Sequence, residues 1–368
     1  MDIYDLLRQM VQESASDLFI KVGTAPGLRI NGKVRLLEGA QTTSDMAQEF
    51  YEKLADARVR RMYEADGEVD TAITIDGIGR FRINIFRQQN QTGMVFRHVK
   101  SVVPTLEELN LPVNQLKKIA SIPRGLVLVT GITGSGKSST LAAMVEYINS
   151  TMRKHVVTIE DPIEFIFEDK RSIIDQREIG IDTRNFVSAL KHVVRQNPDI
   201  ILLGEIRDKE TIDAAITAAE TGHLVMSTLH TLTAMQTVER IMNFYPPHQQ
   251  DFVKEQLSLV MEGVISQRLV PKKTGDGRLP AVELMLATPS VREILHEGKT
   301  RDLYKAIKEG GYFGCQTFNQ ALKGMLQQDL ITVDDALANA NNPDELKLEI
   351  RGIQKGTKSA GDFEFKNF

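Results

Sequence analysis

The sequence predicts an α/β protein with two parts. Residues 1–100 form a small α+β domain, and residues 116–353 form a larger domain with a mostly parallel sheet and a helical C-terminal layer. Two observations support this class. Short apolar runs alternate with helical stretches between about residues 119 and 231, as in βαβ units. Before residue 100, strand patterns follow one another directly, as in antiparallel sheets.

The first domain begins with a helix and ends in strands. Apolar spacing predicts a helix over about 2–11, and DLFIKV at 17–22 is typical of a strand. LRINGKVRLL at 28–37 predicts a hairpin around Asn31–Gly32. A single helix is predicted over 46–63.

The end of this domain predicts three strands, within 69–75 and 78–99, separated by turns at Gly77 and at the polar QQNQTG stretch. The next segment, 101–115, holds two prolines and is the predicted linker. A hinge between the two domains is therefore expected there.

In the second domain the apolar runs GLVLV, HVVTI and DIILL predict buried parallel strands. Helical stretches alternate with them at 138–148, 186–195 and 209–221. After about residue 250 the pattern is chiefly helical, with helices predicted at 252–269, 289–299, 301–310 and 318–328. The polar, Gly- and Lys-rich segment 354–368 predicts a flexible tail.

Composition excludes several classes of protein. Hydrophobic residues at 42%, charged residues at 26% and a net charge of −4 disfavour disordered, collagen-like and disulfide-stapled chains. Cys315 is the only cysteine, so a tetracysteine zinc site is excluded and a reducing compartment is favoured. The N-terminal residues lack a signal-peptide pattern, and no 18-residue apolar run exists. A cytoplasmic protein without a strong attraction to nucleic acid is expected.

The strongest motif is a phosphate loop, G-x4-G-K-S, which lies between a predicted strand and a predicted helix. Its glycines turn backbone N–H groups toward phosphates, Lys137 reaches the β- and γ-phosphate oxygens, and the Ser138 hydroxyl can ligate Mg²⁺. A glycine-rich turn without a ligand is the alternative. The candidate nucleotide-binding residues are Gly131, Thr133, Gly134, Ser135, Gly136, Lys137, Ser138 and Ser139.

Bound nucleotide also needs an acidic residue at the end of a neighbouring strand. Glu205 follows the run DIILL, where a carboxylate can orient the attacking water or hold magnesium. A second acidic cluster, with Glu160, Asp161 and Glu164, closes the strand HVVTI. Ligands bind at the carboxyl ends of parallel strands. The spacing leaves open which glutamate is the base, and a solvated acidic loop is the alternative for the cluster.

The remaining candidate site residues are histidines and arginines. His223 and His230 are predicted to flank one strand, so they are poor metal ligands; either one can contact a γ-phosphate or serve only structure. Arginines in the last strands of the first domain can reach transition-state phosphate charge, or can be ordinary exposed residues. They are Arg80, Arg82, Arg87 and Arg97.

Four stretches in this order resemble the type II/type IV secretion ATPase superfamily. They are GITGSGKS, TIEDPIEF, RQNPDIILLGEIRD and TGHLVMSTLHT. The stretches SDLFIKVGTAPGLRINGKV and RFRINIFRQQNQTGMVFR, with the total length, are similar to the pilus retraction ATPases of the PilT/PilU type within it. The resemblance spans residues 1 to about 350.

The resemblance implies a PAS-like N-terminal domain, a RecA-like P-loop ATPase domain and a homohexamer that binds ATP and Mg²⁺ at subunit boundaries. It implies mechanical work on a type IV pilus through an inner-membrane, PilC-like platform protein, which would hold the chain peripherally at the membrane. A paralogous retraction ATPase is a further implied partner.

By resemblance, several residues receive roles. Lys137 and Ser138 match phosphate and Mg²⁺ ligands, and Glu205 matches the Walker B glutamate, a catalytic and metal-site residue. Glu160 and Glu164 match the acidic box. In the histidine box, His223 matches a nucleotide-binding residue and His230 a catalytic one. Arg82 and Arg97 match arginines that reach the nucleotide, and Arg195 and Arg240 match less closely.

The absence of a tetracysteine motif and of a longer N-terminal region favours retraction over extension. PSVREIL at 289–295 is only loosely similar to the AIRNLI-like motif of PilT-type members, and the ending ALANANNPDELKLEIRG looks more like PilU-type members. The subtype stays open. An accessory subunit with weak turnover and a RecA-like nucleic-acid translocase are the alternative functions.

Overall fold

The computed structural model describes residues 2–30, 32–99 and 102–356. The chain divides into two compact units. The first comprises Met1–Val102 with Ile163–Phe167, and the second comprises Val103–Pro162 with Glu168–Phe368. Both units combine helices with a sheet, which confirms the predicted α/β class.

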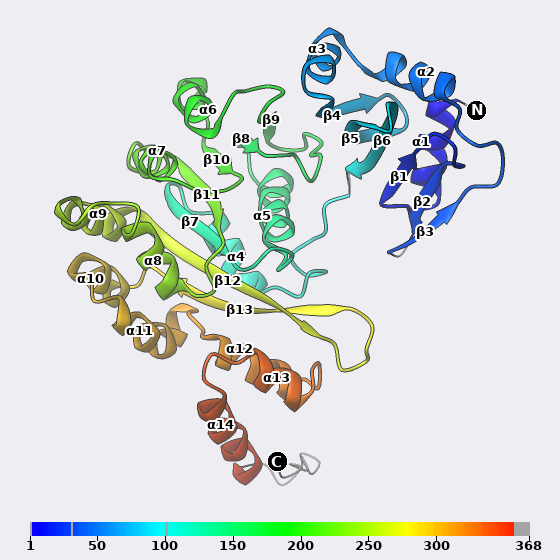
Figure 1. Ribbon diagram of the computed structural model, residues 1–368. Helices are drawn as coiled ribbons and strands as arrows, with labels where there is room; N and C mark the ends of the chain where they lie inside the picture. Colours follow the sequence, from blue (N-terminus) through cyan, green and yellow to red (C-terminus); the bar gives the residue numbers. More distant parts are fainter. Residues whose placement is uncertain (1, 31, 100–101, 357–368) are drawn as a thin grey trace. The chain divides into compact units, whose positions relative to one another are not determined.

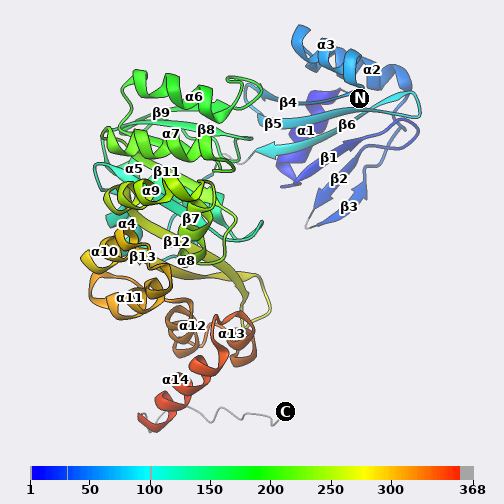
Figure 2. The same ribbon diagram turned by 60° about the vertical axis from the view of Figure 1, so that its left-hand side comes forward.

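The first unit contains a six-stranded antiparallel sheet in the order β3-β2-β1-β6-β5-β4 (Figure 2). Its elements are α1 (Ile3–Gln12), β1 (Asp17–Ile20), β2 (Gly27–Ile30), β3 (Lys33–Leu36), α2 (Ser44–Leu54), α3 (Ala57–Asp66), β4 (Glu68–Ile75), β5 (Gly79–Gln88) and β6 (Gln91–Val99). The strands at 69–75 and 78–99 and the hairpin at 28–37 are thereby confirmed; Asn31 itself lies outside the described residues.

The alternation of side chains along β5 explains how this sheet builds a core. Phe81, Ile83 and Ile85 are at most 1% exposed and pack with residues of α1, α2 and α3 in one apolar cluster. Successive strand residues point to opposite faces, so Arg80 and Arg82 lie on the other face of the sheet. The core face and the arginine face are thus set by the same alternation.

The predicted single helix over 46–63 is wrong, because the chain forms two helices there. Helix α2 ends at Leu54, and Asp56 is the N-cap of α3. Its carboxylate accepts hydrogen bonds from the backbone N–H groups of Arg58 and Val59, both at 2.8 Å. Aspartate in this position stabilises a new helix start, which apolar spacing alone does not reveal.

The second unit is built on a seven-stranded sheet in the order β13-β12-β7-β11-β10-β8-β9 (Figure 1). All neighbouring strands are parallel except β12 and β13. The strands are β7 (Gly125–Thr130), β8 (His155–Glu160), β9 (Ile173–Glu178), β10 (Ile200–Leu203), β11 (Leu224–Leu229), β12 (Met261–Pro271) and β13 (Arg278–Leu286). The predicted parallel strands β7, β8 and β10 lie inside this sheet.

Helices connect and flank these strands. They are α4 (Val113–Ala120), α5 (Lys137–Thr151), α6 (Phe186–Val193), α7 (Lys209–Glu220), α8 (Ala234–Met242), α9 (Pro247–Val260), α10 (Pro289–Glu297), α11 (Leu303–Glu309), α12 (Phe318–Gln327), α13 (Val333–Asn339) and α14 (Pro343–Gly356). Short 3₁₀ turns occur at Val194–Gln196, Thr300–Asp302 and Gly310–Phe313. Among the described residues, none of the helices is both long enough and apolar enough to span a bilayer.

The predicted helix over 252–269 is wrong in its second half. Helix α9 ends at Val260, and the chain continues as the antiparallel strands β12 and β13. Strand β12 lies inside the sheet beside β7, and helices α8 and α13 pack against it. Residues on both of its faces are buried, so its sequence shows no strand-like alternation. Strand β9 was not predicted either, because it lies at the sheet edge and is largely polar.

The C-terminal layer contains the predicted helices α10, α11 and α12, followed by α13 and α14. Helix α14 extends to Gly356, so residues 354–356 are helical rather than part of a tail. The remaining residues of the predicted tail, 357–368, lie outside the described residues. So do residue 100, which ends the predicted first domain, and residue 101, which starts the predicted linker.

Candidate nucleotide-binding site

The phosphate loop joins β7 to α5, with all six residues of β7 buried. Gly134 and Gly136 have φ values of +78° and +93°, in the left-handed region that glycine adopts at little cost. Gly131 is needed for space as well: a Cβ there would lie 2.5 Å from both the Gln267 carbonyl oxygen and the Ser135 Oγ. The glycine pattern therefore corresponds to real conformational demands of the loop.

Two polar side chains of this loop are buried. Lys137 is 8% exposed, and its Nζ donates to the carbonyl oxygens of Gly131 and Ile132 at 2.8 and 3.1 Å. Ser135 is 2% exposed, and among the described residues its Oγ has no hydrogen-bond partner. Such a hydroxyl is costly to bury without a partner. An anionic ligand in the loop would satisfy it and would attract the Lys137 ammonium, so these residues fit a nucleotide phosphate.

Glu205 follows β10 at the same edge of the sheet as the phosphate loop, because β7 and β10 both run parallel to β11 between them. The residues on either side of Glu205 are hydrogen-bonded to β11. Thr228 Oγ1 donates to the Gly204 carbonyl at 2.7 Å, and the Ile206 N–H donates to the Thr228 carbonyl at 3.0 Å. These contacts fix the backbone that carries the carboxylate.

The Glu205 carboxylate has two basic neighbours. Arg207 Nε donates to Oε2 at 2.9 Å, and His230 Nε2 lies 3.3 Å from Oε1. His230 follows the carboxyl end of β11. The structure therefore brings together the predicted Walker B glutamate and the second histidine of the histidine box.

The two glutamates of the acidic box lie in different units. Glu160 ends β8, and its Oε1 accepts from Thr158 Oγ1 at 2.7 Å and from Gln176 Nε2 at 3.3 Å. Glu164 is exposed and belongs to Ile163–Phe167, which is grouped with the first unit. Glu160 is thus held at the carboxyl edge of the second unit's sheet.

The residues present fit a magnesium ion bound together with nucleotide. Among the described residues, no cluster of three or more His, Cys, Asp or Glu side chains forms a metal cage. Mg²⁺ at nucleotide sites does not need one, since it retains water and binds phosphates with one or two protein oxygens. The Ser138 hydroxyl in the first turn of α5 and a carboxylate such as Glu205 are donors of the required kind.

The predicted arginines Arg82 and Arg97 are direct cross-strand partners on β5 and β6. Arg97 Nε donates to Asp17 Oδ1 at 3.0 Å, and Arg29 Nε donates to Asp17 Oδ2 at 3.1 Å. Asp17 is buried and Arg97 is exposed. A buried carboxylate between two guanidinium groups holds Arg97 in place and offsets the repulsion between Arg82 and Arg97.

The family of type II/IV secretion system proteins matches residues 2–279 of the chain. This chain belongs to that family. The type IV pilus retraction ATPase PilT of Pseudomonas aeruginosa is 43% identical over 344 residues, covering 94% of this chain and 99% of the relative. The type IV pilus ATPase PilU of the same organism is 42% identical over 351 residues, covering 95% and 92%.

A solved relative of this secretion-family chain shows the same fold. The crystal structure of the pilus retraction motor PilT with bound ADP has a TM-score of 0.88 and 39% identity, and it covers 95% of this chain and 99% of that one. The predicted resemblance to this family, with its N-terminal domain and C-terminal ATPase-type domain, is confirmed.

The two predicted site histidines, His223 and His230, lie at opposite ends of β11, as their spacing predicts. His223 precedes the strand, and its carbonyl accepts from the N–H of Gly125, the first residue of β7. Its Nδ1 lies 2.8 Å from the Ala218 carbonyl near the end of α7. The phosphate loop begins six residues further along β7, about 20 Å away at ~3.3 Å per residue. The structure therefore separates His223 from the loop of its own chain.

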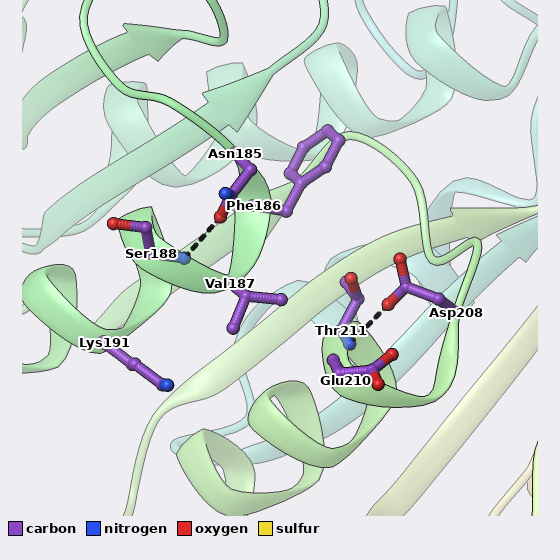
Figure 3. Close-up of a pocket in the computed structure, with 8 residues that line it drawn as sticks. All are labelled: Asn185, Phe186, Val187, Ser188, Lys191, Asp208, Glu210 and Thr211. Atoms are coloured by element: carbon purple, nitrogen blue, oxygen red, sulfur yellow. Dashed lines mark hydrogen bonds between the residues drawn. The ribbon is translucent and has the colours of Figure 1, made fainter.

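A cavity of about 580 Å³ was not predicted from the sequence. It lies where α6 and α7 begin, and Figure 3 shows the two helix caps that border it. Asn185 Oδ1 accepts from the Ser188 N–H, and Asp208 Oδ1 accepts from the Thr211 N–H, both at 2.8 Å. Capping patterns in the sequence are the signal for these helix starts. The cavity contains none of the predicted nucleotide-binding residues.

Glu283 was also missed. It lies on β13, is 2% exposed, and its Oε1 accepts from the Ala234 N–H at 2.8 Å. Burial raises the pKa of its carboxyl group to about 7, against the opposing effects of that hydrogen bond and of the positive charge of Arg268. Tyr304 of α11 is a further titratable neighbour. A lone glutamate within an apolar stretch gave no sequence signal of this burial.

The raised pKa of Glu283 predicts a pH-dependent stability. The folded protein binds a proton at Glu283 more tightly than the unfolded chain, whose value is near 4.5, so stability falls as pH rises from about 4.5 to about 7 and levels off above. The fall amounts to about 3 kcal/mol. For Glu283→Gln, we expect the free energy of unfolding, measured with denaturant, to show no such fall between pH 5 and 8. Parallel stability curves for the wild type and the variant would contradict it.

Proposed function

We propose that this protein is an ATP-hydrolysing motor that powers type IV pilus retraction. The observation that supports it most directly is the phosphate loop, placed at the same sheet edge as the Glu205–His230 pair. In this loop Lys137 is buried, and the Ser135 hydroxyl has no hydrogen-bond partner within the described part of the chain. The PilT and PilU relatives, which match over nearly their whole length, supply the biological context.

In the proposed reaction, each residue acts on ATP by its position and charge. The loop N–H groups and the Lys137 ammonium hold the phosphates and offset the charge that develops during transfer. Glu205 orients the attacking water, and His230 fixes the direction of the Glu205 carboxylate. Glu160, held by Thr158 and Gln176, adds negative charge at the same edge of the sheet.

Magnesium is the proposed cofactor of this reaction. When bound, Mg²⁺ neutralises phosphate charge and holds the phosphates in line. Ser138 and Glu205 are the residues proposed to hold it, the latter directly or through water. The chain's own contribution is to fix Ser138 in the first turn of α5 and Glu205 just after β10.

We also propose that the chain works as a homohexamer, in which Arg82 and Arg97 act on nucleotide at a subunit boundary. The two arginines are direct partners on β5 and β6, and Asp17 holds Arg97 in place. This arrangement supports joint action of the two side chains on the nucleotide. Glu164, on a segment grouped with the first unit, is proposed to act at the same boundary. The 101–115 segment is the proposed linker between the domains.

The proposed partners follow from this function. A PilC-like platform protein of the inner membrane would receive the motion, and it would hold the motor at the membrane from the cytoplasmic side. PilT and PilU occur in one organism, P. aeruginosa. A paralogous retraction ATPase is therefore a second proposed partner of this chain.

Turnover and mass of the purified protein test this function together. We expect Mg²⁺-dependent ATP hydrolysis that appears only at concentrations where mass photometry detects hexamers. Deletion of the gene in its host should leave pili that extend but do not retract, as followed by fluorescent pilin labelling. Turnover in the monomer, or normal retraction in the deletion strain, would contradict the proposal.

The same measurements separate the alternatives. A hexamer that binds ATP but hydrolyses it only when a paralogue is added would indicate an accessory subunit. Stimulation of turnover by DNA or RNA would indicate a nucleic-acid translocase. The net charge of −4 argues against the latter, since nucleic-acid translocation needs a basic surface.

A further inference from the structure

We infer that Glu283 is a positioning residue for ATP hydrolysis: it fixes the start of α8 and thereby the segment that carries His230 to Glu205. The inference rests on the proposed function, because His230 and Glu205 are its catalytic pair. Glu283 is well separated from them in sequence, on β13. Two sets of contacts and the strand register support the connection.

The first contact joins Glu283 to α8. Ala234 is the first residue of α8 and is fully buried, and its N–H donates to Glu283 Oε1 at 2.8 Å. Helix N-terminal N–H groups have no acceptor within the helix, and the helix dipole favours an acidic group there. The N-cap Thr233 already accepts from the Gln236 N–H, so Glu283 supplies an acceptor from outside the helix.

The second set of contacts joins α8 to His230. Thr231 Oγ1 and Thr237 Oγ1 are 2.7 Å apart, and the Leu232 N–H donates to Gln236 Oε1 at 3.2 Å. The residues between His230 and α8 are therefore bound to the first turns of α8. A shift of the helix start would move His230, whose Nε2 lies 3.3 Å from Glu205 Oε1.

The strand register places Glu283 in a row of polar residues that ends beside the phosphate loop. Glu283 is the register partner of Ser266 on β12, which is the register partner of Thr130 on β7. Directly paired residues share a face of the sheet. Thr130 Oγ1 donates to Ser266 Oγ at 2.9 Å, and Thr130 immediately precedes Gly131. Glu283 therefore lies on the sheet face that also carries Ser266 and Thr130, and Thr130 directly precedes the phosphate loop.

Glu283→Leu tests the inference, because leucine keeps the apolar packing and removes the acceptor for the Ala234 N–H. We expect kcat for ATP to fall by about 10- to 100-fold, the scale of a misplaced catalytic group. Binding of fluorescently labelled ADP, which depends on the loop, should change less than about threefold. Glu283→Gln retains an acceptor oxygen and should restore kcat to within about threefold of the wild type.

A matched control separates positioning from general destabilisation. Val282 is the adjacent residue on β13, is also 2% exposed, and points to the opposite face. Val282→Ala should lower Tm. It should not show the pattern expected of Glu283→Leu, in which kcat falls while ADP binding stays nearly unchanged. In a His230→Ala background, Glu283→Leu should cause no further loss of kcat if it acts through His230. Unchanged kcat in Glu283→Leu, no rescue by Gln, or additive losses would overturn the inference.

A readout without turnover keeps this inference distinct from the proposed function. The imidazole NMR signals of His230 in nucleotide-free protein should shift in Glu283→Leu and stay in place in Glu283→Gln and Val282→Ala. Unmoved signals in Glu283→Leu would overturn the positioning role even if ATP hydrolysis is normal. If the wild type hydrolyses no ATP, the proposed function fails, while these signals still report whether Glu283 places His230.

Discussion

Substitution of Lys137 by alanine should reduce ATP turnover by at least about 100-fold, the usual cost of removing one group that stabilises developing charge. The Lys137 ammonium lies inside the loop, 2.8 Å from the Gly131 carbonyl, and alanine leaves the phosphates without their nearest cation. Fluorescently labelled ADP should also bind more weakly, because the lysine contributes to the ground state as well. Steady-state phosphate release and an ADP titration measure both effects.

The control is Lys118→Ala, which removes an exposed lysine of α4 and should leave turnover unchanged. Far-UV circular dichroism checks that both variants are folded. A Lys137→Ala protein that keeps more than about a tenth of wild-type turnover would show that this loop is not the hydrolysis site.

Replacement of Glu205 by glutamine should lower kcat by about 10²- to 10⁴-fold, the range for loss of a general base. Glutamine keeps the size of the side chain but removes the charge that orients water and attracts Arg207 and His230. ADP affinity should change little, because the phosphate loop is untouched. Single-turnover hydrolysis measures the chemical step separately from product release.

Glu255→Gln, on the exposed side of α9, is the matched control and should hydrolyse ATP at the wild-type rate. If Glu205→Gln retains turnover while Glu160→Gln abolishes it, the base belongs to the acidic box instead. The pair of variants thus distinguishes Glu205 from Glu160, two of the three glutamates that the sequence left open as the base.

Features with a local cause could be predicted from the sequence. The glycines of the phosphate loop meet steric demands within a few residues of themselves, and the strand and helix on either side follow from apolar patterns. The flanking of β11 by His223 and His230 follows from their spacing and the strand between them. These predictions needed no knowledge of the rest of the chain.

The pairing of Arg82 with Arg97 was predictable in principle. Gln89 and Asn90 both have positive φ values, as in a two-residue hairpin turn, and such a turn sets the register of both strands. Counting outward from it places these arginines opposite each other. The carboxylate of Asp17 between two arginines was not predictable, because β1 pairs with β6 across 80 residues of sequence.

Features with a distant cause were missed for the same reason. Residues on both faces of β12 are buried, and the helices that pack against the strand, α8 and α13, are not visible in its own sequence. Glu283 gains its importance from α8, which lies 49 residues earlier in the chain. Such contacts depend on strand order, and strand order is a property of the whole fold.

The support of the phosphate loop by β12 has a consequence for biosynthesis. Thr130 and Ser266, which meet beneath the loop, are 136 residues apart in the chain. A ribosome adds about 5–20 residues per second, so the loop waits roughly 7 to 27 seconds for its supporting strand to be translated. The nascent chain therefore exposes this glycine-rich turn, without a finished nucleotide pocket, until the C-terminal half emerges from the ribosome.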